Sequence, residues 1–184
     1  MLLPDFSFIY KYFSGEKQET LLFLIVGIAA ILLAVIFWFF IKTNSSFFKG
    51  AAIPLLAIGI IQAVVGYTVY ARSDKQEKDI AYNMGLETVT YTKQVELPRM
   101  EKVMNNFTIY RWVEIAFILS GIVLVFLYRS NPDRSFWYGL GITLAIQATL
   151  MLGADYFAEK RGAVYKEKLE ELINGRGATS DLNT

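Results

Sequence analysis

The sequence predicts an all-α polytopic membrane protein, a four-helix up-down transmembrane bundle with helical cytoplasmic extensions. Of the 184 residues, 54% are hydrophobic and 19% are charged, an apolar share above the ~45–50% of ordinary soluble domains. The apolar residues gather in four segments, each near the roughly 20 residues that a helix needs to cross a bilayer. Short polar turns join these segments in pairs, so we expect two membrane hairpins.

The first two spans are expected at residues 21–41 and 50–71, neither of which contains a charge. Trp38 and Lys42 at the end of the first span are typical interfacial anchors. Pro54 would lie in the first turn of the second span, where its missing N–H costs little.

The residues before the first span, 1–19, predict a short interfacial helix lying on the membrane. Phe6, Ile9 and Phe13 follow helical spacing, and Ser14 with the glycine after it would end the helix.

The polar segment at residues 72–108 predicts an extramembrane helical hairpin whose arms continue the second and third spans. Thr88 and its neighbours weaken a helix at the tip, and Pro98 suits a fresh helix start. Helical spacing predicts a shared apolar seam between the extensions, formed by Met84, Val103, Phe107 and Leu169.

The third and fourth spans are expected at about residues 109–128 and 136–156. The third has few charge-free residues and must include Arg111 and Glu114 to reach a crossing length. Helical character continues to about Ile173. We therefore expect a single domain over residues 1–173 and a flexible tail at 174–184.

Basic residues predict the orientation of the chain. Only four of the 18 Lys and Arg residues lie in the short loops, which leaves 14 on the side of the termini. The positive-inside rule then places both termini in the cytoplasm, and a bacterial inner membrane is the expected location.

The composition lowers the expectation of catalysis. The chain has no histidine and no cysteine, which removes the commonest general base, the thiolate nucleophile and the usual transition-metal ligands. We therefore expect neither an enzyme, nor a bound metal or cofactor. A net charge of +1 gives no basic field for nucleic acid.

One cluster of ionisable residues is expected where four helix ends meet at the same depth: Arg72, Arg111, Glu114, Asp155 and Glu159. It suits a proton or cation entry site, or a carboxylate metal site, because ionisable groups inside membranes face the bundle interior. The favoured interpretation is structural: Glu114 stays ionised, pairs with Arg111 or Arg72, and serves assembly.

Two further patterns concern helix packing. Gln62 and Gln147 each lie near the middle of a span, so they predict an interhelical hydrogen bond or, less favoured, a polar pathway. Small residues recur at helical spacing in the second and fourth spans and predict close backbone packing: Gly59, Ala63, Gly66, Gly141, Ala145, Thr149 and Gly153.

Two functional classes remain open. The favoured one is a non-enzymatic membrane protein that works through contacts, as an accessory subunit, scaffold or sensor-like adaptor, with another membrane protein or a second copy as partner. The alternative is a small oligomeric carrier or channel for protons, cations or a small solute, which uses the carboxylates at the membrane boundary.

Overall fold

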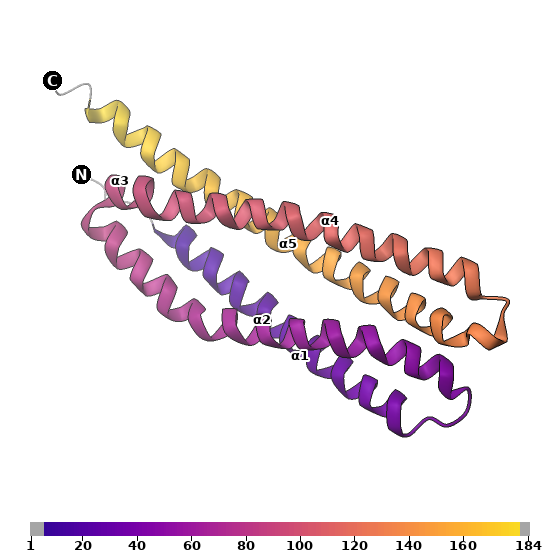
Figure 1. Cartoon of the computed structure of the whole chain (residues 1–184). Coiled ribbons are helices and arrows are strands. Elements are labelled where there is room, and N and C mark those ends of the chain that lie inside the picture. The colour runs from indigo at the N-terminus through magenta and orange to yellow at the C-terminus, as the bar shows by residue number, and fades with distance from the viewer. Residues whose placement is uncertain (1–5, 181–184) are drawn as a thin grey trace.

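The computed structural model describes residues 6–180, with side chains as far as residue 175. This part of the chain is all-helical and has no strand. It forms two antiparallel hairpins, the first from α1 and α2 and the second from α4 and α5 (Figure 1). The elements are α1 (Ser7–Phe39), α2 (Ser45–Leu86), α3 (Thr88–Tyr91), the π-helical turn η1 (Thr92–Glu96), α4 (Leu97–Tyr128), the 3₁₀ turn η2 (Pro132–Arg134) and α5 (Ser135–Ser180).

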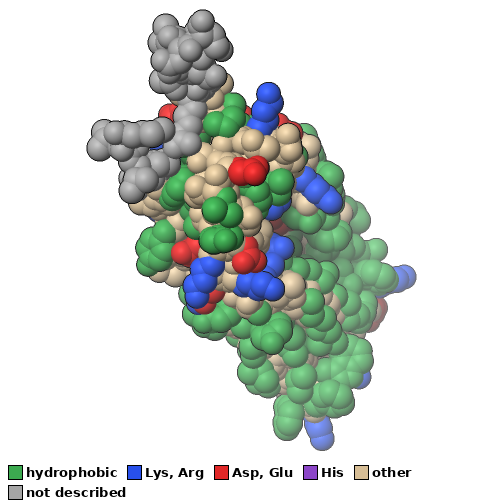
Figure 2. Space-filling view, turned by 90° about the vertical axis from the view of Figure 1, so that its left-hand side faces the viewer, with side chains coloured by type: hydrophobic (Ala, Val, Ile, Leu, Met, Phe, Trp, Pro, Cys, Tyr) green, Lys and Arg blue, Asp and Glu red, His purple; other side chains and the backbone are tan. Residues whose placement is uncertain are grey.

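Four helical segments are long and apolar enough to cross a membrane. They are Ser7–Phe39, Ser45–Leu86, Thr88–Tyr128 and Pro132–Gly175. Acidic and basic side chains gather at the end of the molecule nearest the termini, and hydrophobic side chains cover the surface behind it (Figure 2). Surfaces as apolar as this are unusual in soluble monomers.

The helices form an open rather than a closed bundle. α1 packs along α2, and α4 packs along α5, while the two hairpins are joined mainly through α2 and α5. α4 packs on α5 and η1 and makes at most marginal contact with α1 and α2. One side of α4 therefore has no packing partner within the described chain.

The expectation of a separate interfacial helix before the first span is wrong. α1 runs unbroken from Ser7 to Phe39, so the first span also has an extension outside the membrane segment. A Cβ on Gly15 would lie 2.9 Å from Cδ of Arg161. Gly15 therefore lets α5 approach α1 closely and does not end the helix.

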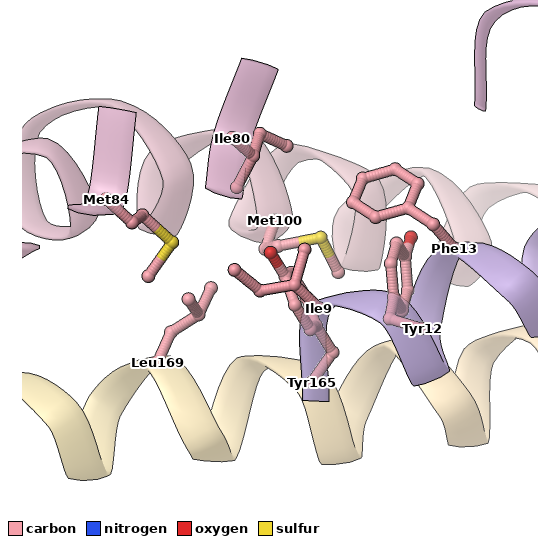
Figure 3. Packing of buried hydrophobic residues seen from close by; sticks show 8 residues of the cluster. All are labelled: Ile9, Tyr12, Phe13, Ile80, Met84, Met100, Tyr165 and Leu169. Atoms are coloured by element: carbon pink, nitrogen blue, oxygen red, sulfur yellow. The ribbon is translucent and has the colours of Figure 1, made fainter. Parts of the chain in front are cut away.

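A compact core forms where the four extensions meet, outside the predicted spans (Figure 3). Tyr12 of α1 stacks on Tyr165 of α5, with 4.3 Å between the ring centroids. The cluster consists of Ile9, Tyr12, Phe13, Ile80, Met84, Met100, Tyr165 and Leu169, with Val103 packed against it. The predicted seam is thus present for Met84, Val103 and Leu169. Phe107 lies close to Gly162, 3.9 Å from the position of a Cβ on that glycine.

The polar hairpin at 72–108 is helical, as predicted, but its return arm differs. The chain turns at Glu87, and helix resumes at Thr88 instead of at Pro98. Pro98 lies at the start of α4 directly after η1. A π turn is one way in which a helix accommodates a proline that cannot donate its N–H.

Two helix ends also differ from expectation. α2 begins at Ser45, so Pro54 lies inside the helix and not in its first turn. Thr143 of α5 donates a hydrogen bond to the carbonyl of Ala51, at 2.9 Å, in the region where the proline disturbs the helix. α5 continues to Ser180, whereas a flexible tail was expected from 174. Residues 181–184 of that tail lie outside the described chain.

Candidate functional site

A groove of about 240 Å³ lies between the two hairpins. α1 contributes Phe23, α2 contributes Ile61 and Val65, and α5 contributes Met151. α4 forms the remaining wall with Tyr110, Val113, Glu114 and Phe117, and Asp155 of α5 completes the lining. The groove is therefore apolar except for two carboxylates.

Glu114 is buried in this groove opposite the carboxyl group of Asp155, and no basic side chain pairs with it within the described chain. Its relative exposure is 2%, and neither of its carboxylate oxygens accepts a hydrogen bond within the described chain. The ionisable group that acts on it is the carboxyl of Asp155 on the facing helix. A buried carboxylate is stable only if it is paired or protonated. A proton or a cation is therefore needed at this pair.

Arg111 does not neutralise Glu114, contrary to the favoured interpretation of the sequence. Its guanidinium forms an ion pair with Glu159 of α5. α4 and α5 are antiparallel, and Glu114 faces Asp155. Arg111, one turn before Glu114, therefore lies opposite Glu159, one turn after Asp155. The pairing follows this register between the helices, and the three-residue spacing on α4 does not determine it.

Arg72 lies apart from the acidic pair. It is exposed on α2 and lines a different pocket, together with Glu96 and Arg99. The five residues predicted to cluster thus separate into the Glu114–Asp155 pair, the Arg111–Glu159 ion pair and an isolated Arg72. Within the described residues, no group of three or more acidic side chains could hold a metal ion.

Oε1 of Gln62 and Nε2 of Gln147 do not bond to each other. Gln62 and Gln147 are both buried, at 1% and 3% exposure. α2 and α5 run parallel, and Thr143 of α5 donates a hydrogen bond to Ala51 of α2. Gln147 lies one turn after Thr143, so it is level with Leu55, one turn after Ala51. Gln62 lies seven residues beyond Leu55, about 10 Å along α2 at 1.5 Å per residue. Oε1 of Gln62 and Nε2 of Gln147 have no partner in the described chain.

The small residues of α2 pack against α1. A Cβ on Gly59 would lie 3.0 Å from the carbonyl oxygen of Gly27, and a Cβ on Gly66 would lie 2.7 Å from the backbone nitrogen of Leu24. A Cβ on Gly27 would lie 2.7 Å from the backbone nitrogen of Ala63. Close backbone approach therefore holds the first hairpin together.

The small residues of α5 divide into two groups. Gly141 and Ala145 pack on Gly121 of α4. A Cβ added to Gly121 would lie 2.7 Å from the carbonyl oxygen of Gly141. Thr149 and Gly153 are exposed, and a Cβ on Gly153 would meet nothing within 4 Å.

A second buried polar cluster was not predicted. Glu96, 1% exposed, accepts hydrogen bonds from Arg99 at 2.8 and 2.6 Å and from the hydroxyl of Tyr165 at 2.8 Å. Burial, together with the nearby Glu96 carboxylate, raises the pKa of Tyr165. The three-residue spacing of Glu96 and Arg99 is the feature of the sequence that indicates an ion pair between them.

No protein-family model matches the chain, and neither a curated protein nor a solved structure is significantly similar to it. The case for a function therefore rests on the groove and its acidic pair.

Proposed function

We propose that this protein is a small integral membrane protein that works through contacts, as an accessory subunit, scaffold or sensor-like adaptor. The observation that carries the proposal is the Glu114–Asp155 pair, which no basic side chain of the described chain neutralises, in an apolar groove that this chain does not fill. We place the protein in the bacterial inner membrane with both termini in the cytoplasm, on the basis of the basic-residue bias.

The occupant that fits this groove is a transmembrane helix of another protein that carries a lysine or an arginine. Apolar side chains of such a helix would cover Phe23, Val65 and Phe117. Its cation would neutralise Glu114 and Asp155, since ionisable groups in membranes pair with one another. Within its span, α4 packs mainly on α5, and its other side chains, among them Trp112, Leu119 and Phe126, are exposed, so α4 has a free side.

A second copy of the chain is a poorer occupant. Arg111 is the only lysine or arginine within the segments 21–41, 50–71, 109–128 and 136–156, and it already pairs with Glu159. A homodimer would therefore bring no free cation to the groove, whereas a different membrane protein can.

A carrier of protons or cations is the second candidate, and the facing carboxylates favour it. Against it, neither Gln62 nor Gln147 lines the groove that holds the acidic pair, and Oε1 of Gln62 and Nε2 of Gln147 have no hydrogen-bond partner in the described chain. A catalytic role is not proposed, because the groove lining in the described chain offers no hydroxyl, thiol or amine beside a general base that would activate it as a nucleophile.

The proposal is tested with a synthetic transmembrane peptide. The peptide is a leucine-alanine helix with one lysine placed at the depth of Glu114, and a second peptide has leucine at that position. Binding is measured by energy transfer in phosphatidylcholine vesicles that contain the purified protein. We expect the lysine peptide to bind the natural protein at least tenfold more tightly than the Glu114→Gln variant.

Glu101→Gln serves as the matched control, because Glu101 is an exposed acid on α4 outside the span. It should leave binding of the lysine peptide unchanged. Equal binding to the natural protein and Glu114→Gln would overturn the proposal. The carrier would be favoured instead if the natural protein conducts protons or potassium ions in the same vesicles and the Glu114→Gln variant does not.

A further inference from the structure

A second groove, of about 320 Å³, lies outside the spans between the start of α1 and the second half of α5. It shares no lining residue with the acidic groove. Aromatic rings form much of its lining, among them Phe8, Tyr12, Phe157 and Tyr165. Four basic side chains also line it: Lys11, Lys160, Arg161 and Lys168.

The basic residues of this groove are only partly neutralised. Lys168 pairs with Glu171, and Arg161 pairs with Glu19, the only acid in the lining. Lys11 and Lys160 form no ion pair within the described chain. The groove therefore carries an excess of positive charge.

Arg161 indicates where an anion would bind. Its guanidinium lies over the ring of Tyr12, 5.6 Å from the centroid. Its Nε is buried and has no hydrogen-bond acceptor in the described chain. A phosphate oxygen would supply the acceptor that this donor lacks, in a charge-assisted hydrogen bond.

The end of the groove formed by Lys160 and Arg161 matches the level of the lipid headgroups. Lys11, ten residues before the first span, extends the groove about 15 Å from the hydrocarbon core at 1.5 Å per residue. Lys160 and Arg161 follow the expected end of the fourth span by four and five residues, or about 6–8 Å at 1.5 Å per residue. The headgroup layer on each side of the hydrocarbon core is about 5–8 Å thick. Tyr156 and Phe157 are 60% and 63% exposed at this level, as expected for aromatic side chains at a membrane interface.

We propose that this groove binds the phosphate-bearing headgroup of an anionic lipid. Lys11, Lys160 and Arg161 contact the phosphate, and the exposed ring of Phe157 packs against the glycerol backbone and the first part of an acyl chain. Clusters of basic residues at the membrane boundary recognise anionic lipids in this way. The inference does not depend on the acidic groove or its partner.

A lipid-binding site in this groove can be distinguished from a general attraction between basic residues and anionic membranes. The general effect depends on how many cations lie near the surface, whereas a site depends on which cations are removed. Lys78 and Lys102 provide the comparison, since both are exposed, form no ion pair within the described chain, and lie outside the groove.

The experiment measures binding of spin-labelled phosphatidylglycerol in phosphatidylcholine vesicles that contain the full chain, with labelled phosphatidylcholine as reference. We expect the double variant Lys11→Gln/Lys160→Gln to lose at least tenfold in preference for the anionic lipid. The matched double variant Lys78→Gln/Lys102→Gln should stay within twofold of the natural protein. Circular dichroism and thermal unfolding establish that both variants are folded.

Two outcomes would overturn the inference. Equal losses in the two double variants would show an attraction that is not localised in the groove. Full displacement of the labelled lipid by millimolar inorganic phosphate would show a site for a soluble anion instead of a lipid.

Discussion

The hydroxyl of Tyr165 donates a hydrogen bond of 2.8 Å to Oε1 of Glu96. This bond joins the last helix to the π-helical turn that leads into α4. Arg99 binds the same carboxylate through two nitrogens, so a buried acid connects two helices that are far apart in the sequence.

We expect Tyr165→Phe to lower the free energy of unfolding in detergent by about 2 kcal/mol, the range for a hydrogen bond to a charged group. The ring remains stacked on Tyr12, so the change isolates the hydroxyl. Tyr82→Phe is the control, because Tyr82 is 68% exposed. An equal effect of both variants would mean that the bond to Glu96 contributes nothing.

Alkaline pH should destabilise the protein through the same core. Burial, reinforced by the Glu16 carboxylate, raises the pKa of Tyr12 to about 12, whereas the unfolded value is about 10. This stabilisation is fully present below about pH 10. It is lost as the pH rises toward 12, because the unfolded chain releases its proton first.

We therefore expect Tyr12→Phe to make the fall in stability shallower by up to about 1.4 kcal/mol per pH unit above pH 10. Denaturant titrations in detergent at several pH values measure this slope. A Tyr12→Phe slope identical to the natural one would contradict the assignment.

The glycines of the second hairpin offer a paired test of helix packing. Gly121→Ala should cost about 1–3 kcal/mol, the range for overpacking, because its Cβ would lie 2.7 Å from the carbonyl oxygen of Gly141. Gly153→Ala should be neutral or stabilise by up to about 1 kcal/mol through helix propensity, because nothing lies within 4 Å of its Cβ. Thermal midpoints in detergent compare the two; the opposite order would show that α4 and α5 pack differently.

The proposed topology is tested by single cysteines, since the natural chain contains none. Cysteines at Thr43 and Ser130, in or beside the two short loops, should react with an impermeant thiol reagent on intact cells. A cysteine at Glu167, exposed on α5, should react only after the cells are broken. Labelling of Glu167 alone on intact cells would reverse the orientation.

Much of the helical architecture can be predicted from the sequence because charge-free runs of membrane length leave few alternatives. The arrangement of the acidic groove cannot be predicted from the sequence, because it depends on the register between the helices. The spacing of Arg111 and Glu114 shows that they share a face of α4, but only the position of α5 determines that Arg111 contacts Glu159 and that Glu114 contacts Asp155.

Glycines show the same limit. Gly15 was interpreted as a helix end, although it admits the side chain of Arg161. Gly153 continues a regular four-residue repeat, yet within the described chain no other helix comes within 4 Å of the position of its Cβ. Spacing within one helix identifies positions where close approach is allowed, and the packing of the other helices decides where it occurs.

The open bundle divides the molecule mechanically. α1, α2 and α5 contact one another and form a three-helix frame, with the Tyr12–Tyr165 core at one end and the close approach of Gly50 to Phe136 at the other. α4 contacts this frame chiefly along α5 and through the π-helical turn, and its first turn is held by Met100 in the shared core. If a partner helix enters the acidic groove as proposed, we expect α4 to shift against the three-helix frame, because α4 packs mainly on one helix of that frame.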